Sequence, residues 1–309
     1  NIVRAYTSAV PEIGKPRQGR YVVIEFNPYD SNASSWYFGF NPGIRQAIDY
    51  GNNMVYEVKL KHDLNYLTQD ITSGKVTKPG PSIQIIKQNS IFRLAGTSIL
   101  YADEFINAMY TDSTNPTIKS IGYNFYAPKT KSSEKMPLVL FLHGSGQSHD
   151  YINLSNNLLA DVKSPLLANQ GGVAWIENGK ERCFVLVPQM PARDTKDPQG
   201  RSGWINAETQ KLLVGLLDMI IEQNPNIDKN RIYLTGLSMG GQGSWGLIMD
   251  PEVSDQFAAA VICCGMPSSF LSGTNYEIIS TLASFDYSNT KLPLWLFHCD
   301  TDLSVNVLG

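Results

Sequence analysis

The chain has 309 residues, of which 42% are hydrophobic, 10% aromatic and 17% charged, and this composition excludes a disordered or fibrous protein. Its formal net charge of −3 at pH 7, without a run of Lys and Arg, argues against a nucleic-acid partner. The longest apolar stretches, such as Ala258 to Cys264, are much shorter than the ~20 residues of a membrane-spanning helix, which argues against a membrane partner.

The N-terminal part of the chain alternates apolar and polar residues with a period of two. Met54 and Tyr56 share one face of a predicted strand, whereas Glu57 and Lys59 share the other. The same alternation occurs at residues 22–26 and 36–40, with Asn-Pro, Pro-Gly and Gly-Asn pairs between the runs. This pattern predicts a small antiparallel β-sandwich.

The length of the chain favours two domains. The boundary between them is predicted near residue 117. Asp103 to Met109 is expected to form a short helix that leads out of the β-domain, and Tyr110 to Ser120 to form the linker. Residues 1–117 are therefore assigned to the β-domain with its exit linker. Residues 118–309 are assigned to a second domain.

The second domain contains short continuous apolar runs separated by helical stretches. The runs are Leu138–Leu142, Phe184–Val187, Ile232–Leu234, Ala258–Ile262 and Leu292–Phe297. They suit parallel strands that are buried on both faces. The strongest helix is predicted from Ala207 to Gln223, with Asn206 as its N-cap and Asn224-Pro225 as its stop. The alternation predicts a doubly wound α/β sheet.

The most specific motif is Gly236-Leu237-Ser238-Met239-Gly240, between a predicted strand and a helix rich in small residues. A G-x-S-x-G sequence in this context is a nucleophile elbow, which raises the serine hydroxyl above the strand ends. The alternative is a chance match in a glycine-rich turn. A serine hydroxyl needs a base to become a nucleophile, so the elbow predicts further parts of a site.

An oxyanion hole is the first of these parts. The run from Pro137 ends in His143-Gly144-Ser145-Gly146, where this fold supplies a backbone donor. We expect the N–H groups of Met239 and Ser145 to be the donors, with Gly144 as the rival of Ser145. His143 precedes the serine, so it is predicted to be a structural histidine and not the base.

The second part is an acid after a later strand, and the sequence offers Asp300 and Asp302. The alternative for both is a solvated turn. Their position after Ser238 agrees with the chain order of α/β-hydrolases, in which the serine comes first, the acid second and the histidine last.

These motifs resemble α/β-hydrolase esterases of the polyhydroxybutyrate-depolymerase-like and feruloyl-esterase-like group, including those with an N-terminal immunoglobulin-like domain. The resemblance runs from about Ile121 to Val307 through PLVLFLHGSG, FVLVPQMP, NRIYLTGLSMGGQGSW, FAAAVICCG and LWLFHCDTD. The stretch RYVVIEF is similar to the immunoglobulin-like part. The resemblance implies an α/β-hydrolase fold and a serine carboxylesterase.

The resemblance implies Ser238 as nucleophile and Asp302 as the acid, because the family sequence there reads His-Gly-Asp-x-Asp-x-x-Val-Pro-Val. This chain differs in having Cys299 for the glycine and Asn306 for the proline. Gln189 and Trp204 are expected to line the acyl or leaving-group side. For Trp204 the alternative is a ring packed between helix and sheet.

The family's base is a histidine that follows one more strand beyond the acid. The four histidines here, at positions 62, 143, 149 and 298, all precede Asp302. The chain starts at Asn1 without a methionine or apolar leader, so we expect a mature form, a trimmed form or a fragment. The expectation is that the last strand, the last helix and the base are missing, which would leave the 309-residue chain nearly inactive. A substitute base from His62 or His149 is the alternative.

The expected reaction needs no metal and no organic cofactor. A zinc site built from His143, His149, Asp150 and His298 has no recognised ligand spacing. The four cysteines are too few and too irregularly spaced for a disulfide scaffold, and buried packing is predicted for them. The expected partner is a small-molecule or polymer ester in a secreted or extracytoplasmic setting. Acyl esters of plant polysaccharides and polyesters are the candidate substrates.

Two alternative functions fit the same residues. A serine peptidase of the same fold would use the same catalytic groups. A non-catalytic binding protein would keep the hydrolase fold as a scaffold, with the β-domain holding a polysaccharide or a surface. The β-domain would otherwise be a spacer or a lid over the serine. The sequence does not predict the oligomeric state.

Overall fold

The computed structural model describes the chain over 15 stretches. These are residues 2–10, 12–17, 19–27, 37–41, 44–48, 60–67, 83–92, 101–115, 120–131, 133–144, 147, 171–177, 181–190, 203–265 and 291–302. Contacts divide the chain into two units. One comprises Asn1–Ser35 with Asp49–Ser98, and the other comprises Trp36–Ile48 with Ile99–Gly309. In the described part of the chain, no helix is both long enough and apolar enough to cross a membrane.

The first unit contains antiparallel strand pairs. β1 (Ile2–Ser8) pairs with β2 (Tyr21–Phe26), and β5 (Leu64–Leu67) pairs with β6 (Ile83–Ile86). The predicted strand at 22–26 is therefore present, but Val22 and Phe26 are 52% and 41% exposed. Among the described residues, β2 pairs only with β1. The predicted strand at 54–60 lies almost wholly outside the described residues, and the sandwich remains a prediction.

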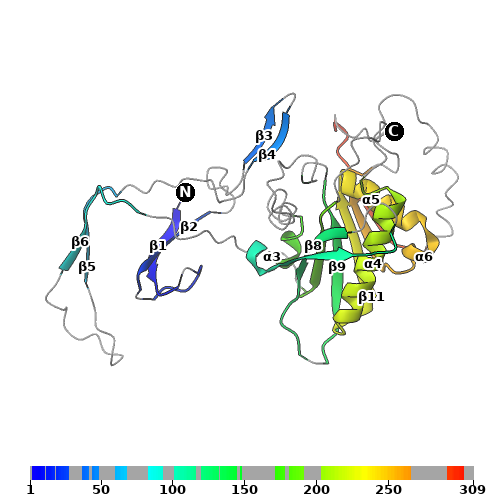
Figure 1. The fold of residues 1–309 in the computed structure, drawn as a ribbon, viewed down its shortest axis with the longest axis horizontal. Coiled ribbons are helices and arrows are strands. Elements are labelled where there is room, and N and C mark those ends of the chain that lie inside the picture. Colours follow the sequence, from blue (N-terminus) through cyan, green and yellow to red (C-terminus); the bar gives the residue numbers. More distant parts are fainter. Residues whose placement is uncertain are drawn as a thin grey trace. The chain divides into compact units, whose positions relative to one another are not determined.

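The second unit contains a seven-stranded sheet with the order β13-β12-β11-β9-β10-β8-β7 (Figure 1). Its strands are β7 (Ile106–Thr111), β8 (Ser120–Tyr126), β9 (Met136–Leu142), β10 (Phe184–Pro188), β11 (Ile227–Leu237), β12 (Ala259–Cys263) and β13 (Leu294–Phe297). All five predicted apolar runs are strands, and β9 to β13 are mutually parallel. This unit also contains the β3–β4 hairpin (Tyr37–Asn41 and Ile44–Ile48).

Two predictions for the region before the sheet are wrong. Residues 106–111 form strand β7 instead of a helix, and only the short 3-10 helix Ala102–Glu104 precedes it. The linker prediction placed the domain boundary too late, because β7 pairs with β8 inside the second unit. Ile106 and Met109 are spaced like residues on one helix face, but both are exposed on an edge strand. Pairing with β8, and not a local pattern, determines this strand.

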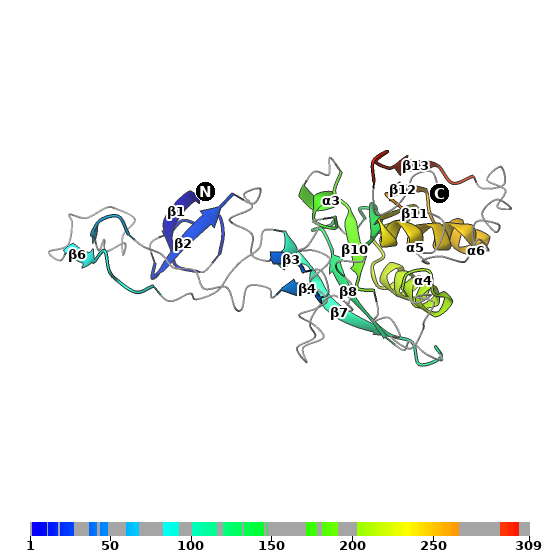
Figure 2. The same cartoon turned by 90° about the horizontal axis from the view of Figure 1, so that it is seen from above.

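The helices pack on the sheet and enclose its core. α4 (Ala207–Gln223) has the predicted bounds, and the side chain of Asn206 accepts hydrogen bonds from the N–H groups of Glu208 and Thr209. α5 (Met239–Met249) packs on β9, β11 and β12, and lies beside α4 (Figure 2). Short helices α3 (Ala174–Glu177) and α6 (Pro251–Ser254) complete the described elements. The fully buried core includes Leu140, Leu186 and Leu234 from the central strands.

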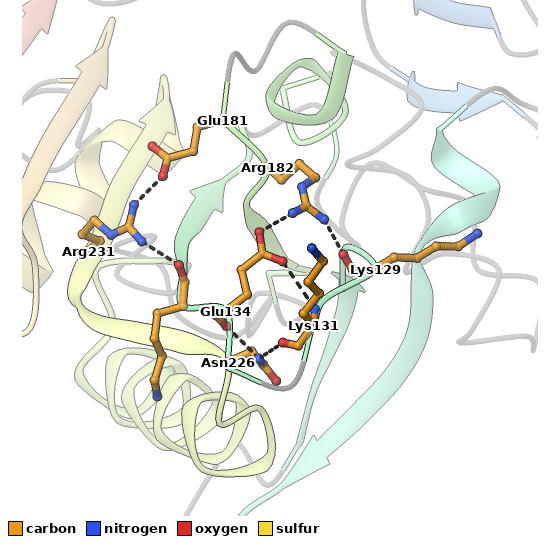
Figure 3. A network of polar contacts seen from close by, with 8 residues as sticks. Lys129, Lys131, Glu134, Glu181, Arg182, Asn226 and Arg231 are labelled. Atoms are coloured by element: carbon orange, nitrogen blue, oxygen red, sulfur yellow. Dashed lines mark hydrogen bonds and ion pairs between the residues drawn. The ribbon is translucent and has the colours of Figure 1, made fainter.

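A network of charged groups ties the amino ends of three parallel strands together (Figure 3). Arg231 pairs with Asp228 and Glu181 and donates to the carbonyl oxygen of Lys135 at 2.8 Å. The guanidinium of Arg231 lowers the pKa of the Asp228 carboxyl, because it donates a hydrogen bond that stabilises the carboxylate. Arg182 pairs with Glu134 in the same way. Because these residues precede β9 and β10 or lie in the first half of β11, the carboxyl ends of those strands lie at the opposite edge of the sheet.

Candidate active site

Ser238 lies at the carboxyl edge of the sheet, where β11 turns sharply into α5. Its φ of 55° and ψ of −117° are unusual for a residue with a side chain, and such a backbone costs of order 1–3 kcal/mol. Ser238 is partly exposed. Its N–H donates to the carbonyl oxygen of Cys263 at 2.9 Å, and its carbonyl oxygen accepts from Gln242 at 3.0 Å. The surroundings therefore hold a strained residue in place at a position that solvent reaches.

Close backbone approach explains the two glycines of the motif. A Cβ on Gly236 would lie 2.3 Å from the carbonyl oxygen of Gly240. A Cβ on Gly240 would lie 1.9 Å from the carbonyl oxygen of Leu142. Both contacts are with backbone atoms that cannot move aside, so only glycine fits at these positions. The start of α5 is thereby packed against the end of β9, which carries the predicted oxyanion segment.

The candidate oxyanion donors meet beside Ser238. Met239 is the first residue of α5, so its N–H has no partner within the helix, and the helix N-terminus favours negative charge. Gly144 is close, because a Cβ added to it would lie 3.7 Å from the Cβ of Ser238. Ser145, the other candidate, lies outside the described residues. The structure thus places both Met239 and Gly144 next to Ser238.

The candidate acids follow β13 at the same edge of the sheet. Asp302 is 17% exposed in its side chain, and its Oδ2 lies 3.8 Å from Nε2 of His298. Its N–H donates to the carbonyl oxygen of Cys299 at 3.2 Å, which closes a turn. Asp300 is exposed. Partial burial and a histidine neighbour distinguish Asp302 from Asp300 as the better placed acid.

Backbone hydrogen bonds connect the serine to the acid turn across β12. The N–H of Ser238 is bonded to Cys263, and the N–H of Cys264 donates to the carbonyl oxygen of Phe297 at 2.7 Å. The ends of β11 and β13 are thus two strand spacings apart, or roughly 10 Å. This separation suits a third group between the hydroxyl and the carboxylate. In the described residues the hydroxyl of Ser238 makes no hydrogen bond.

Gln189 and Trp204 are placed differently from the expectation that they line a substrate pocket. Both side chains are 0% exposed. Trp204 donates from Nε1 to the carbonyl oxygen of His143 at 2.9 Å, and Gln189 donates from Nε2 to the carbonyl oxygen of Gln147 at 2.7 Å. Trp204 is therefore a packed ring, which was the alternative to a substrate contact. Neither side chain is accessible to a substrate in this structure.

His143 is a buried structural histidine. Its Nε2 accepts from the N–H of Met190 at 2.9 Å, and its Nδ1 lies 2.7 Å from the carbonyl oxygen of Gly144. Among the described residues no group of His, Cys, Asp and Glu could hold a metal ion. Of the residues considered for zinc, His149 and Asp150 lie outside the described part of the chain.

All four cysteines are free, but not all of them are buried as predicted. Cys183 is buried, and burial raises the pKa of its thiol to about 11. Cys299 is exposed instead, in the acid turn, which corrects the packing prediction for this residue. A hydrogen bond from Thr301 lowers the pKa of the Cys299 thiol, because it stabilises the thiolate.

Comparison with solved structures finds hydrolases. A thermostable esterase is 26% identical and superposes with a TM-score of 0.58, over 99% of this chain and 72% of that protein. A lipase/esterase from Lactobacillus plantarum is 16% identical over 66% of this chain and 81% of its own, with a TM-score of 0.41. The acylaminoacyl peptidase of Pyrococcus horikoshii is 18% identical over 66% of this chain and 33% of its own, with a TM-score of 0.40.

No protein family model and no curated protein sequence matches the chain. The sheet order and the likeness to the thermostable esterase show that the second unit has the α/β-hydrolase fold. In this fold the carboxyl ends of the parallel strands carry the site.

Proposed function

We propose that this protein is a serine carboxylesterase that hydrolyses carboxylic esters through an acyl-enzyme on Ser238. The observation that carries the proposal is the strained backbone of Ser238, with its φ of 55°, between β11 and the N-terminus of α5. Strain of this kind persists at functional sites, and the partly exposed hydroxyl is within reach of a substrate. The likeness to a thermostable esterase supports the same reaction class.

The proposed reaction has two stages. The hydroxyl oxygen of Ser238 attacks the ester carbonyl carbon while a histidine takes its proton and Asp302 stabilises the resulting imidazolium. The N–H groups of Met239 and of the Gly144–Ser145 segment stabilise the oxyanion. The alcohol leaves with the proton from the histidine, and water then attacks the acyl-enzyme and releases the carboxylic acid. We propose no cofactor for this reaction.

The base of this reaction is proposed to be a histidine outside the 309 residues. Both ring nitrogens of His143 are engaged with Met190 and Gly144. His298 lies beyond β12 from the serine and faces Asp302. His62 belongs to the first unit, and His149 lies outside the described residues. Among the described residues, then, no histidine is bonded to the Ser238 hydroxyl.

The outermost strand, β13, supports this proposal. Trp295, Leu296 and Phe297 are 65%, 54% and 45% exposed, whereas the central strands β9 and β10 are wholly buried. Strands of a doubly wound sheet bury both of their faces. A further strand and helix beside β13 would cover this apolar surface and bring the histidine that the family resemblance implies.

The substrate proposal follows the family resemblance of the sequence. We propose acyl esters of plant polysaccharides or polyesters as substrates, a secreted or extracytoplasmic location, and an immunoglobulin-like fold for the N-terminal β-domain. The product of the complete gene should hydrolyse p-nitrophenyl acetate and a feruloyl ester, and a fluorophosphonate probe should label Ser238. Faster cleavage of peptide substrates would favour a serine peptidase. Absence of labelling would favour a non-catalytic binding protein.

Separate substitutions of Asp302 and Asp300 test which of the two is the catalytic acid. Asp302→Asn is expected to lower kcat for p-nitrophenyl acetate by about 10⁴, because the amide cannot stabilise the imidazolium. Asp300→Asn is the matched control, since Asp300 is exposed in the same turn, and its kcat should stay within about threefold of wild type. The reverse order of effects would assign the acid to Asp300.

A further inference from the structure

Three buried polar side chains lie in or beside the segment that follows β9, which begins at His143. His143, Gln189 and Trp204 are each 0% exposed, and the reaction proposed above uses none of them. A buried polar group without a partner destabilises a fold by about 1–3 kcal/mol, so such groups are normally bonded. The side-chain hydrogen bonds of these three residues reach the backbone of His143, Gly144, Gln147 and Met190.

The bonds of His143 determine the position of its ring proton. The N–H of Met190 donates to Nε2, so Nε2 carries no hydrogen and the imidazole is neutral. The proton is therefore on Nδ1, from which it is donated to the carbonyl oxygen of Gly144 at 2.7 Å. One ring thus joins the end of β10 to the peptide of Gly144. The other tautomer would place N–H against N–H at Met190.

Trp204 holds the same segment from the side of α5. Its Nε1–H donates to the carbonyl oxygen of His143, and its ring meets the imidazole edge-on with centroids 5.0 Å apart. A Cβ added to Gly243 in α5 would lie 2.3 Å from the Cβ of Trp204. The indole therefore fills the space between His143 and the helix that starts at the nucleophile.

Gln189 holds the far end of the segment. Its side-chain amide donates to the carbonyl oxygen of Gln147, and its own N–H donates to the carbonyl oxygen of Gly122 in β8 at 2.7 Å. The N–H of Gln147 in turn donates to the carbonyl oxygen of Gly144 at 3.3 Å. Gly144 and Gln147 are thus linked to each other and to β10.

We propose that His143, Gln189 and Trp204, which we call the brace, are positioning residues that hold the backbone of Gly144 and Gln147 in place beside Ser238. The inference rests on the proposed function. A Cβ added to Gly144 would lie 3.7 Å from the Cβ of Ser238, so a displacement of Gly144 changes the surroundings of the nucleophile. Oxyanion donors act only within 2.7–3.1 Å of the oxyanion. The brace acts on the transition state through the backbone, without touching the substrate.

The test uses single variants in the product of the complete gene. His143→Ala removes both ring bonds, and Gln189→Met removes the donor to Gln147. Trp204→Phe removes the indole N–H together with part of the buried ring volume. Each is expected to lower kcat for p-nitrophenyl acetate, by roughly 10² for His143→Ala and about tenfold for the milder pair. KM should change much less than kcat, because ground-state binding does not need the oxyanion contact.

Substitutions that restore one hydrogen bond of His143 distinguish a positioning role from a packing role. In His143→Asn the side-chain amide can donate from the place of Nδ1, and in His143→Gln the side-chain oxygen can accept at the place of Nε2. Both variants should therefore be more active than His143→Ala. Phe184→Leu is the matched control: Phe184 is 3% exposed at the amino end of β10, so its loss should lower stability and leave kcat unchanged.

The outcomes distinguish this inference from the proposed function. Folded Gln189→Met and Trp204→Phe proteins with wild-type kcat would overturn the brace, even if His143→Ala fails to fold. A parallel fall in kcat for Phe184→Leu would also overturn it, because stability alone would then explain the losses. If the wild-type protein shows no turnover that depends on Ser238, the proposed function fails and the brace fails with it.

Discussion

Replacing Ser238 with alanine is expected to lower kcat for p-nitrophenyl acetate by about 10⁶, because the covalent route is lost and only binding and the oxyanion hole remain. The fold should be unaffected, since the hydroxyl makes no hydrogen bond in the described part of the chain. The measurement is the initial rate of the variant and of wild type at equal concentration, with circular dichroism as the check on folding. Turnover that survives in the alanine variant would place the nucleophile elsewhere.

A glycine at the same position separates strain from chemistry. Ser238→Gly should be just as inactive, yet more stable than Ser238→Ala by about 1 kcal/mol, because glycine adopts a positive φ without steric cost. Thermal denaturation of the two variants compares them directly, since both lack the hydroxyl. Equal or lower stability of the glycine variant would show that the elbow stores no strain.

The 309-residue chain by itself is expected to hydrolyse p-nitrophenyl acetate about 10⁶-fold more slowly than the product of the complete gene. The reason is the proposed location of the base, because Ser238 remains protonated and weakly nucleophilic without one. Both proteins are assayed side by side, each against its own Ser238→Ala variant to subtract background hydrolysis.

Equal rates in the two proteins would contradict the proposed location of the base. His298 would then be the first candidate within the chain, because it already lies 3.8 Å from Asp302. His298→Gln would test it, and His62→Gln would test the alternative base from the other unit. Loss of activity in the first variant alone would identify His298 as the base.

Sequence patterns predicted the buried strands and the main helix because those patterns are local. Each of the strands β9 to β13 contains a short continuous apolar run, and α4 has both an apolar stripe and a capping asparagine. β7 was not predicted, since its exposed apolar residues carry no alternation and its pairing partner, β8, lies further along the chain. Edge strands of this kind are defined by hydrogen bonds to a neighbour and not by their own burial.

In the candidate site, too, local features were predicted from the sequence and features that depend on distant residues were not. The Gly-x-Ser-x-Gly motif predicted the elbow because the turn is formed by five consecutive residues whose steric needs are visible in the sequence. The roles of Gln189 and Trp204 were not visible there. Their partners lie 42 and 61 residues away, and only folding brings them together.

The sequence by itself determined the order of buried strands, the bounds of α4 and the bend that presents Ser238, because apolar periodicity, capping and glycine requirements act between residues near one another in the chain. The tertiary structure decided that β7 joins the sheet, that His143 carries its proton on Nδ1, and that Trp204 is buried against α5. These features depend on hydrogen bonds and packing between distant segments, and no local pattern encodes such contacts.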